Sequence, residues 1–220
     1  FPYNNGGEFR KWYGNQEYIV NYENDGYEIK NFYSDSGKLR SRPQNTSFYF
    51  KKGITWSFVS SYKFGARYLP PGFLFDVAGS SLFPEENKLL CLIGFLSSKI
   101  ATNFLSIMNP TLNFQVGNVA NLPIKNLEGN SKIDSIVTKL INISKKDWDI
   151  FESSWDFRTH PFITYKNNKN LNEIFIMWKK DVEIQFESMK RSEEELNGIF
   201  INLLKIKHII FSLNLTIYFL

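Results

Sequence analysis

A change of sequence pattern at Pro84 most strongly constrains what this chain can fold into. Before it, aromatic and β-branched runs alternate with glycine-containing turns, which predicts strands at residues 18–22, 47–50, 55–59 and 73–77. After it, apolar residues recur at helical spacing. Strands and helices that are segregated along a chain indicate an α+β fold. We expect an irregular β-rich lobe over residues 1–84 and a helical or mixed region over residues 85–165.

The helical region begins with an apolar stripe between Glu85 and Met108, which predicts one helix. Two later serine–aspartate pairs have the spacing of an N-terminal capping box, Ser131 with Asp134 and Ser144 with Asp147. We therefore predict that further helices start at these two places.

A single long helix is predicted over residues 170–204, capped by Asn170 with Glu173 at its third position. Apolar residues recur along it every seven residues and fill a neighbouring seam: Phe175, Trp178, Val182, Phe186, Met189, Leu196, Phe200 and Leu203. Such a helix is a spacer or an interaction strut, and we expect its seam to pack on the middle helices or on another chain. Residues 205–220 form an atypical apolar tail.

Composition excludes several classes of protein. With 43% hydrophobic and 17% aromatic residues among 220, the chain is too apolar to be disordered. Its one cysteine, Cys91, excludes an internal disulfide and a cysteine-based zinc site. The apolar runs are interrupted or too short to span a membrane. We therefore expect no membrane partner and a cytoplasmic location.

The motifs of an amino-methyltransferase active site are missing from the sequence. Asn-Pro-Pro-aromatic loops hold a flipped base, and Asn109-Pro110-Thr111-Leu112 lacks the second proline and the aromatic residue. No glycine-rich turn suited to a nucleotide or to S-adenosylmethionine is found. Asp25 with Glu28-Ile29-Lys30 resembles a nuclease metal site only faintly, and a polar turn is favoured. His160 and His208 are scattered, for which structural roles are the default. We expect no catalytic residue, no metal and no cofactor in this chain.

Nucleic-acid binding is suggested by a run of seven cations between Lys38 and Arg67 that contains no acidic residue and is interleaved with aromatic residues. Arg10-Lys11-Trp12-Tyr13 is a second, smaller group of the same kind. Arginine forks can read guanine or clamp phosphate, and glutamine and asparagine can read adenine. The candidate DNA contacts are Arg10, Lys11, Trp12, Tyr13, Lys38, Arg40, Arg42, Gln44, Asn45, Lys51, Lys52, Trp56, Lys63 and Arg67. The alternative is a set of solvated charges on a sheet whose aromatic residues form the core.

A family resemblance adds to this interpretation. Residues 1–26, 38–84 and 94–124, followed by residues 143–157 and 192–200, resemble in order the C-terminal half of the BREX phage-exclusion methyltransferases of the PglX type. The string KKGITWS at residues 51–57 matches a recurring motif of their recognition domain. Beyond Ile201 the family continues with a polar, charged extension, whereas residues 202–220 become apolar here.

The resemblance implies an N6-adenine-specific DNA methyltransferase, distantly similar to type IIG enzymes with TaqI-like specificity domains. The catalytic domain that binds S-adenosylmethionine lies N-terminal to this segment in the family. The chain is therefore expected to be a target-recognition fragment whose partners are double-stranded DNA and the missing methyltransferase domain. The alternative is a protein-interaction scaffold that docks other phage-defence subunits.

Overall fold

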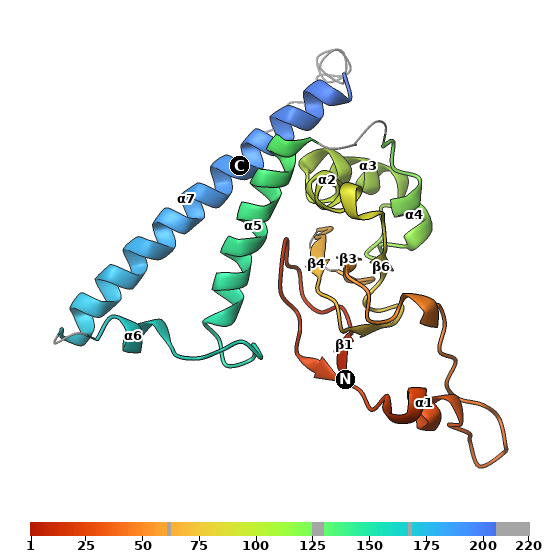
Figure 1. The fold of residues 1–220 in the computed structure, drawn as a ribbon. Helices are drawn as coiled ribbons and strands as arrows, with labels where there is room; N and C mark the ends of the chain where they lie inside the picture. Colours follow the sequence, from red (N-terminus) through yellow and green to blue (C-terminus); the bar gives the residue numbers. More distant parts are fainter. Residues whose placement is uncertain (61–62, 125–129, 167–168, 206–220) are drawn as a thin grey trace.

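The computed structural model describes residues 1–60, 63–124, 130–166 and 169–205, and it has the predicted α+β fold. The predicted apolar tail lies outside the described residues, apart from Lys205, and so does His208. Six short strands are present in the described part of the chain: β1 (Pro2–Asn4), β2 (Tyr18–Ile19), β3 (Gly53–Thr55), β4 (Arg67–Leu69), β5 (Leu74–Phe75) and β6 (Ser81–Leu82). Helices surround the strands and extend from them (Figure 1). In the described residues they are α1 (Glu23–Lys30), α2 (Glu86–Leu96), α3 (Lys99–Met108), α4 (Val116–Ala120), α5 (Ser131–Asp149), α6 (Pro161–Thr164) and α7 (Leu171–Leu203).

The strands form two small three-stranded sheets. In the first, β1 pairs with β2 in an antiparallel and with β5 in a parallel manner. In the second, β3 lies between β4 and β6, and both pairings are antiparallel. The buried Asn4 side chain joins the sheets, because its amide donates to Thr55 Oγ1 at 2.6 Å and to the Gly79 carbonyl at 3.0 Å. A satisfied buried amide at this position fixes how the two sheets meet.

Four strands were predicted and six are present in the described residues, of which β2, β3 and β5 overlap predicted ranges. Of the strand predicted at residues 18–22, only Tyr18–Ile19 forms a strand, and of the one predicted at 73–77, only Leu74–Phe75 does. The strand predicted at residues 55–59 lies instead at residues 53–55, as β3. The strand predicted at residues 47–50 is wrong. A 3₁₀ turn spans Thr46–Phe48, and Phe50 has a positive φ of 65°. That conformation turns the chain and is incompatible with a strand.

The single helix predicted from Glu85 to Met108 is also wrong, because the chain bends by 72° between α2 and α3. Ser98 caps α3 by accepting a hydrogen bond from the Ala101 N–H at 3.2 Å. A serine that caps a new helix favours such a break over continuation. Among the described helices, none is by itself long and apolar enough to cross a membrane. Only α2 and α3, taken together across their bend, reach that length and apolarity.

The main core lies where α2 crosses α5 and α7. Phe95 of α2 meets Phe200 of α7 edge-on, with ring centroids 5.7 Å apart, and both side chains are fully buried. Gly94 allows α2 to approach α5 closely, since a Cβ there would lie only 2.9 Å from Val137 Cγ2. On its other side, α2 packs against β3, whose Ile54 belongs to the same core. The helices therefore fix the position of the second sheet.

The N-terminal cap of α5 differs from the prediction, whereas that of α7 agrees with it. Asn130, not Ser131, caps α5 by accepting from the Ile133 N–H at 3.2 Å. Ser144 lies buried inside α5, so the second predicted start is wrong. For α7 the predicted capping box is confirmed, because Asn170 and Glu173 accept each other's backbone N–H at 3.0 and 2.9 Å. Reciprocal capping sets the start of this 33-residue helix.

Candidate nucleic-acid interface

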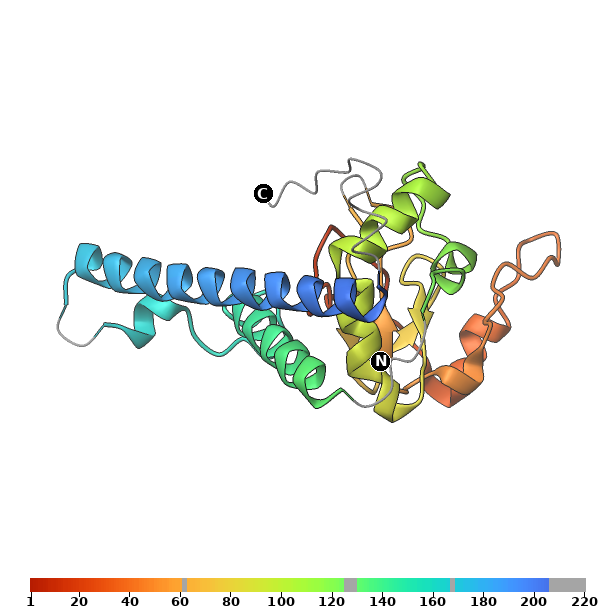
Figure 2. The same cartoon turned by 90° about the horizontal axis from the view of Figure 1, so that it is seen from above.

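A projecting arm, which we define as residues 31–45, leaves the lobe after α1 (Figures 1 and 2). It folds back on itself through hydrogen bonds from the Arg40 N–H to the Phe32 carbonyl at 2.7 Å and from the Ser34 N–H to the Lys38 carbonyl at 2.8 Å. A β-bridge pairs Tyr33 with Leu39. None of the arm residues is buried. The arm is therefore a hairpin-like extension that is held by its own backbone and not by a core.

The arm carries five of the predicted contacts, namely Lys38, Arg40, Arg42, Gln44 and Asn45, and all five side chains are exposed. In the described part of the chain, no carboxylate lies within 4.0 Å of the charged groups of Lys38, Arg40 or Arg42. Cations without an internal partner keep their full charge available for phosphate. The structure therefore brings these five predicted residues together on one projection.

Two aromatic side chains on the arm were missed by the sequence analysis. Phe32 and Tyr33 are 55% and 54% exposed, although both are large and apolar. Exposed aromatic rings next to arginines are able to stack on bases or insert between them. Their position directly before a cation-rich turn was the signal that could have identified them.

The remaining lysines of the predicted run lie on the body of the lobe. Lys51 is exposed and its ammonium lies 5.2 Å from the centre of the Phe48 ring. Lys52 forms an ion pair with Glu86 at the start of α2, and this hydrogen bond raises the Lys52 pKa. Lys63 is exposed. Of these residues, Lys51 is the one best suited to extend the cationic surface of the arm.

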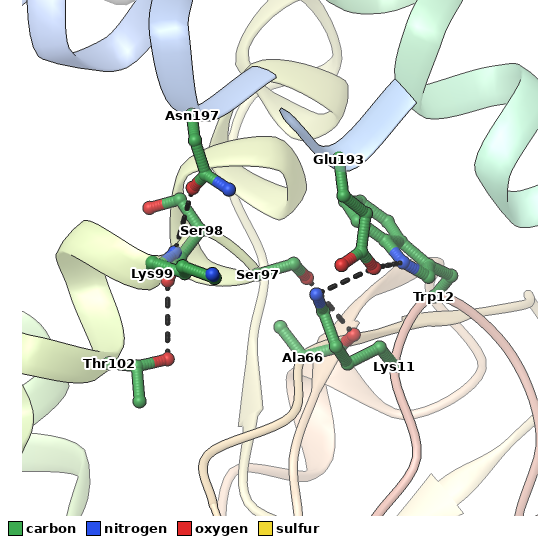
Figure 3. A network of polar contacts seen from close by, with 9 residues as sticks. All are labelled: Lys11, Trp12, Ala66, Ser97, Ser98, Lys99, Thr102, Glu193 and Asn197. Carbon is green, nitrogen blue, oxygen red and sulfur yellow. Dashed lines mark hydrogen bonds and ion pairs between the residues drawn. The ribbon is translucent and has the colours of Figure 1, made fainter. Parts of the chain in front are cut away.

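The predicted group at residues 10–13, which we call the strap, faces the helices and not solvent. Lys11 Nζ and Trp12 Nε1 both donate to Glu193 Oε1 of α7, at 2.6 and 2.7 Å (Figure 3). Burial lowers the pKa of Lys11, an effect that Glu193 opposes. Arg10 donates to Asp147 of α5 at 3.2 Å.

The strap also packs through its aromatic and cationic groups. The Arg10 guanidinium lies 4.7 Å from the centre of the Trp148 ring, and Lys145 lies 5.0 Å from that of buried Tyr13. Close to the strap, Ser97 donates to the Ala66 carbonyl, and Asn197 of α7 accepts from the Lys99 N–H at 2.9 Å (Figure 3). We therefore revise the prediction for residues 10–13: in this structure they clamp the lobe to α5 and α7.

Two further predicted contacts, Trp56 and Arg67, belong to the core. Both are 1% exposed, and the Trp56 indole donates to the Phe114 carbonyl at 2.8 Å. The Arg67 guanidinium donates to Ser57 Oγ at 3.3 Å, while its buried Nε finds no hydrogen-bond partner among the residues that the structure describes. Burial, with a smaller effect from Arg10, lowers the Arg67 pKa to about 10. Side chains this deeply buried cannot reach DNA in this conformation.

We predict that Arg67→Met changes the free energy of unfolding by less than about 1 kcal/mol, because replacing a buried ion with an apolar group of similar volume removes its desolvation penalty. Duplex affinity should stay unchanged. Chemical denaturation and fluorescence anisotropy measure the two quantities, with Arg42→Met as the exposed control that loses affinity. A large loss of affinity in a folded Arg67→Met protein would contradict this assignment.

Comparison with known proteins finds two similar proteins, both named adenine-specific methyltransferases. Adenine-specific methyltransferase PglX of Lacticaseibacillus casei (strain Zhang) is 41% identical over 209 residues, which make up 92% of this chain and 17% of that protein. Adenine-specific methyltransferase BrxX of Escherichia coli O9:H4 (strain HS) is 37% identical over 210 residues, 94% of this chain and 16% of that protein. No family model matches the chain. The chain is thus homologous to a segment of PglX- and BrxX-type adenine-specific methyltransferases and spans a small part of their length.

Proposed function

We propose that this chain recognises double-stranded DNA for an adenine-specific methyltransferase and that the arm makes the main contact. The observation that carries the proposal is the set of exposed cations on the arm, Lys38, Arg40 and Arg42, for which the described residues supply no carboxylate partner. The homology to adenine-specific methyltransferases supports DNA as the substrate.

The arm combines the two kinds of contact that recognition requires. Lysines neutralise phosphates and position the protein, whereas arginine forks and side-chain amides read base edges. Arg40 and Arg42 are followed by Gln44 and Asn45, all exposed on one short segment. A hairpin-like projection of this kind is narrow enough to enter the major groove, which admits a two-stranded ribbon.

Methylation itself belongs to the part of the enzyme outside this chain. The target adenine must leave the base stack to reach a catalytic pocket, and S-adenosylmethionine supplies the methyl group there. The role of this chain is to hold the duplex so that one adenine faces that pocket. We further propose that this activity serves BREX phage defence, which the similarity to PglX and BrxX supports.

We expect the wild-type chain to bind duplex DNA with an affinity that falls steeply with salt. If Lys38 and Lys51 each neutralise one phosphate while Arg40 and Arg42 read base edges, log K should fall by about two units per tenfold rise in salt. Fluorescence anisotropy across a salt series measures this slope. Affinity that is absent or independent of salt would contradict the proposal and favour the protein-interaction scaffold.

A further inference from the structure

The N-terminal half of α7 exposes an apolar flank that the rest of the described chain does not cover. Toward the end of α7, Leu196 and Phe200 of the predicted seam are buried, whereas Leu203 is 45% exposed. Toward its start, Phe175, Val182 and Phe186 are 44%, 41% and 63% exposed. These three residues recur at helical spacing, so they form a continuous stripe.

Beside this stripe, α5 and α7 enclose a groove. The helices are joined near the start of α5, where Lys132 pairs with Glu195 at 2.7 Å, and they separate toward α6 (Figure 1). The groove has a volume of about 560 Å³. Its apolar lining comes from both long helices: Ile143 and Ile150 of the α5 region, and Trp178, Val182, Phe186 and Met189 of α7.

Most of the charged side chains that line the groove are acidic. Three are carboxylates, those of Asp147, Asp149 and Asp181, and one is the ammonium of Lys146. Asp147 pairs with Arg10 and Asp149 with Lys145, so among the described residues Asp181 is the carboxylate without an ion pair. Asp181 also accepts a hydrogen bond from the Tyr165 hydroxyl. An apolar floor with an acidic rim disfavours nucleic acid, whose phosphates seek cations. The groove also lies at the opposite end of the molecule from the arm (Figure 2).

We propose that this groove binds an amphipathic helix with basic flanking residues, supplied by the part of the methyltransferase that this chain does not contain. Two helices that diverge over an apolar floor offer a place for a third, whose apolar side would cover Val182 and Phe186. The relatives supply such a source, because 83% of PglX lies outside the matched segment (100% − 17%). The inference rests on the chain acting within a longer methyltransferase, and it is independent of whether the arm binds DNA.

The test uses this chain with PglX of Lacticaseibacillus casei from which the matched segment has been removed. We expect saturable binding in a calorimetric titration and at least a tenfold loss of affinity for Val182→Asp and Phe186→Asp. An acid placed on the apolar floor is buried on docking and lies next to existing carboxylates. Ile184→Asp is the matched control, since Ile184 is 57% exposed on the same helix but does not line the groove.

Each outcome decides the proposal. Thermal melting of the free variants should match that of the wild type, because the substituted side chains are already solvated. Docking should survive Arg40→Ala, which separates this test from that of DNA binding. Absence of binding by the wild type, or an equal loss in Ile184→Asp, overturns the proposal. A concentration-dependent dimer of the chain alone that Phe186→Asp abolishes would overturn it in favour of a second copy.

Discussion

Arg40→Ala and Arg42→Ala are expected to weaken binding to the cognate duplex by about 1–3 kcal/mol each, and to weaken binding to a scrambled duplex much less. An arginine fork makes two parallel hydrogen bonds to a guanine edge, and alanine leaves those base atoms without a protein partner. Lys51→Ala should instead weaken all sequences about equally and lower the salt slope by about one unit. The two kinds of residue are thus separable by a single assay.

The assay is fluorescence anisotropy on cognate and scrambled duplexes over a salt series. The cognate site can be found by sequencing methylated adenines in the host genome. Lys180→Ala provides the control, because Lys180 is exposed in the N-terminal half of α7. That half of the helix lies on the opposite side of the molecule from the arm (Figure 2). Equal and salt-independent affinities for all variants would show that the arm is only a solvated surface.

Glu193→Leu is expected to lower the free energy of unfolding by about 2–4 kcal/mol. One carboxylate oxygen accepts from both Lys11 and Trp12, so its removal leaves an ammonium and an indole N–H without their acceptor. Both donors are largely buried at the junction between the lobe and α7. Urea denaturation measures the loss, and Glu194→Leu, at an exposed neighbouring position, should cost far less.

A double variant tests the cause of this loss. Lys11→Met combined with Glu193→Leu should recover part of the stability, because no uncompensated charge then remains at the junction. An additive result, with the double variant less stable than either single variant, would show that the ion pair is not the source of the effect.

The parts of the fold that could be read from the sequence are those that neighbouring residues determine. The start of α7 follows from Asn170 and Glu173, which lie three positions apart and cap each other. The apparent cap at Ser144 failed because the same local pattern sits within α5, where tertiary packing keeps the helix continuous. The bend at Ser98 was hidden by an apolar stripe that runs on through both helices. Local patterns thus fix helix type better than helix ends.

The candidate site, like the fold, could be predicted only in part from neighbouring residues. A cation-rich segment is visible in any sequence, but which of its members reach solvent depends on pairing with distant residues. The strap is removed from the surface by Glu193, more than 180 positions away. Arg67 is buried in the second sheet, where β4 pairs with β3 and Arg67 lies opposite Thr55. The predicted residues of the arm stay exposed, because none of residues 31–45 is buried by the described part of the chain.

The self-contained backbone of the arm has a consequence for how specificity evolves in such enzymes. Because none of residues 31–45 is buried, substitutions there leave the packing of both sheets and of the helices unchanged. Under the proposed function, selection for a new DNA target and selection for folding would therefore act on separate sets of residues. A lineage that makes DNA contacts through the arm could then change its target by exchanging this one segment and keep its scaffold.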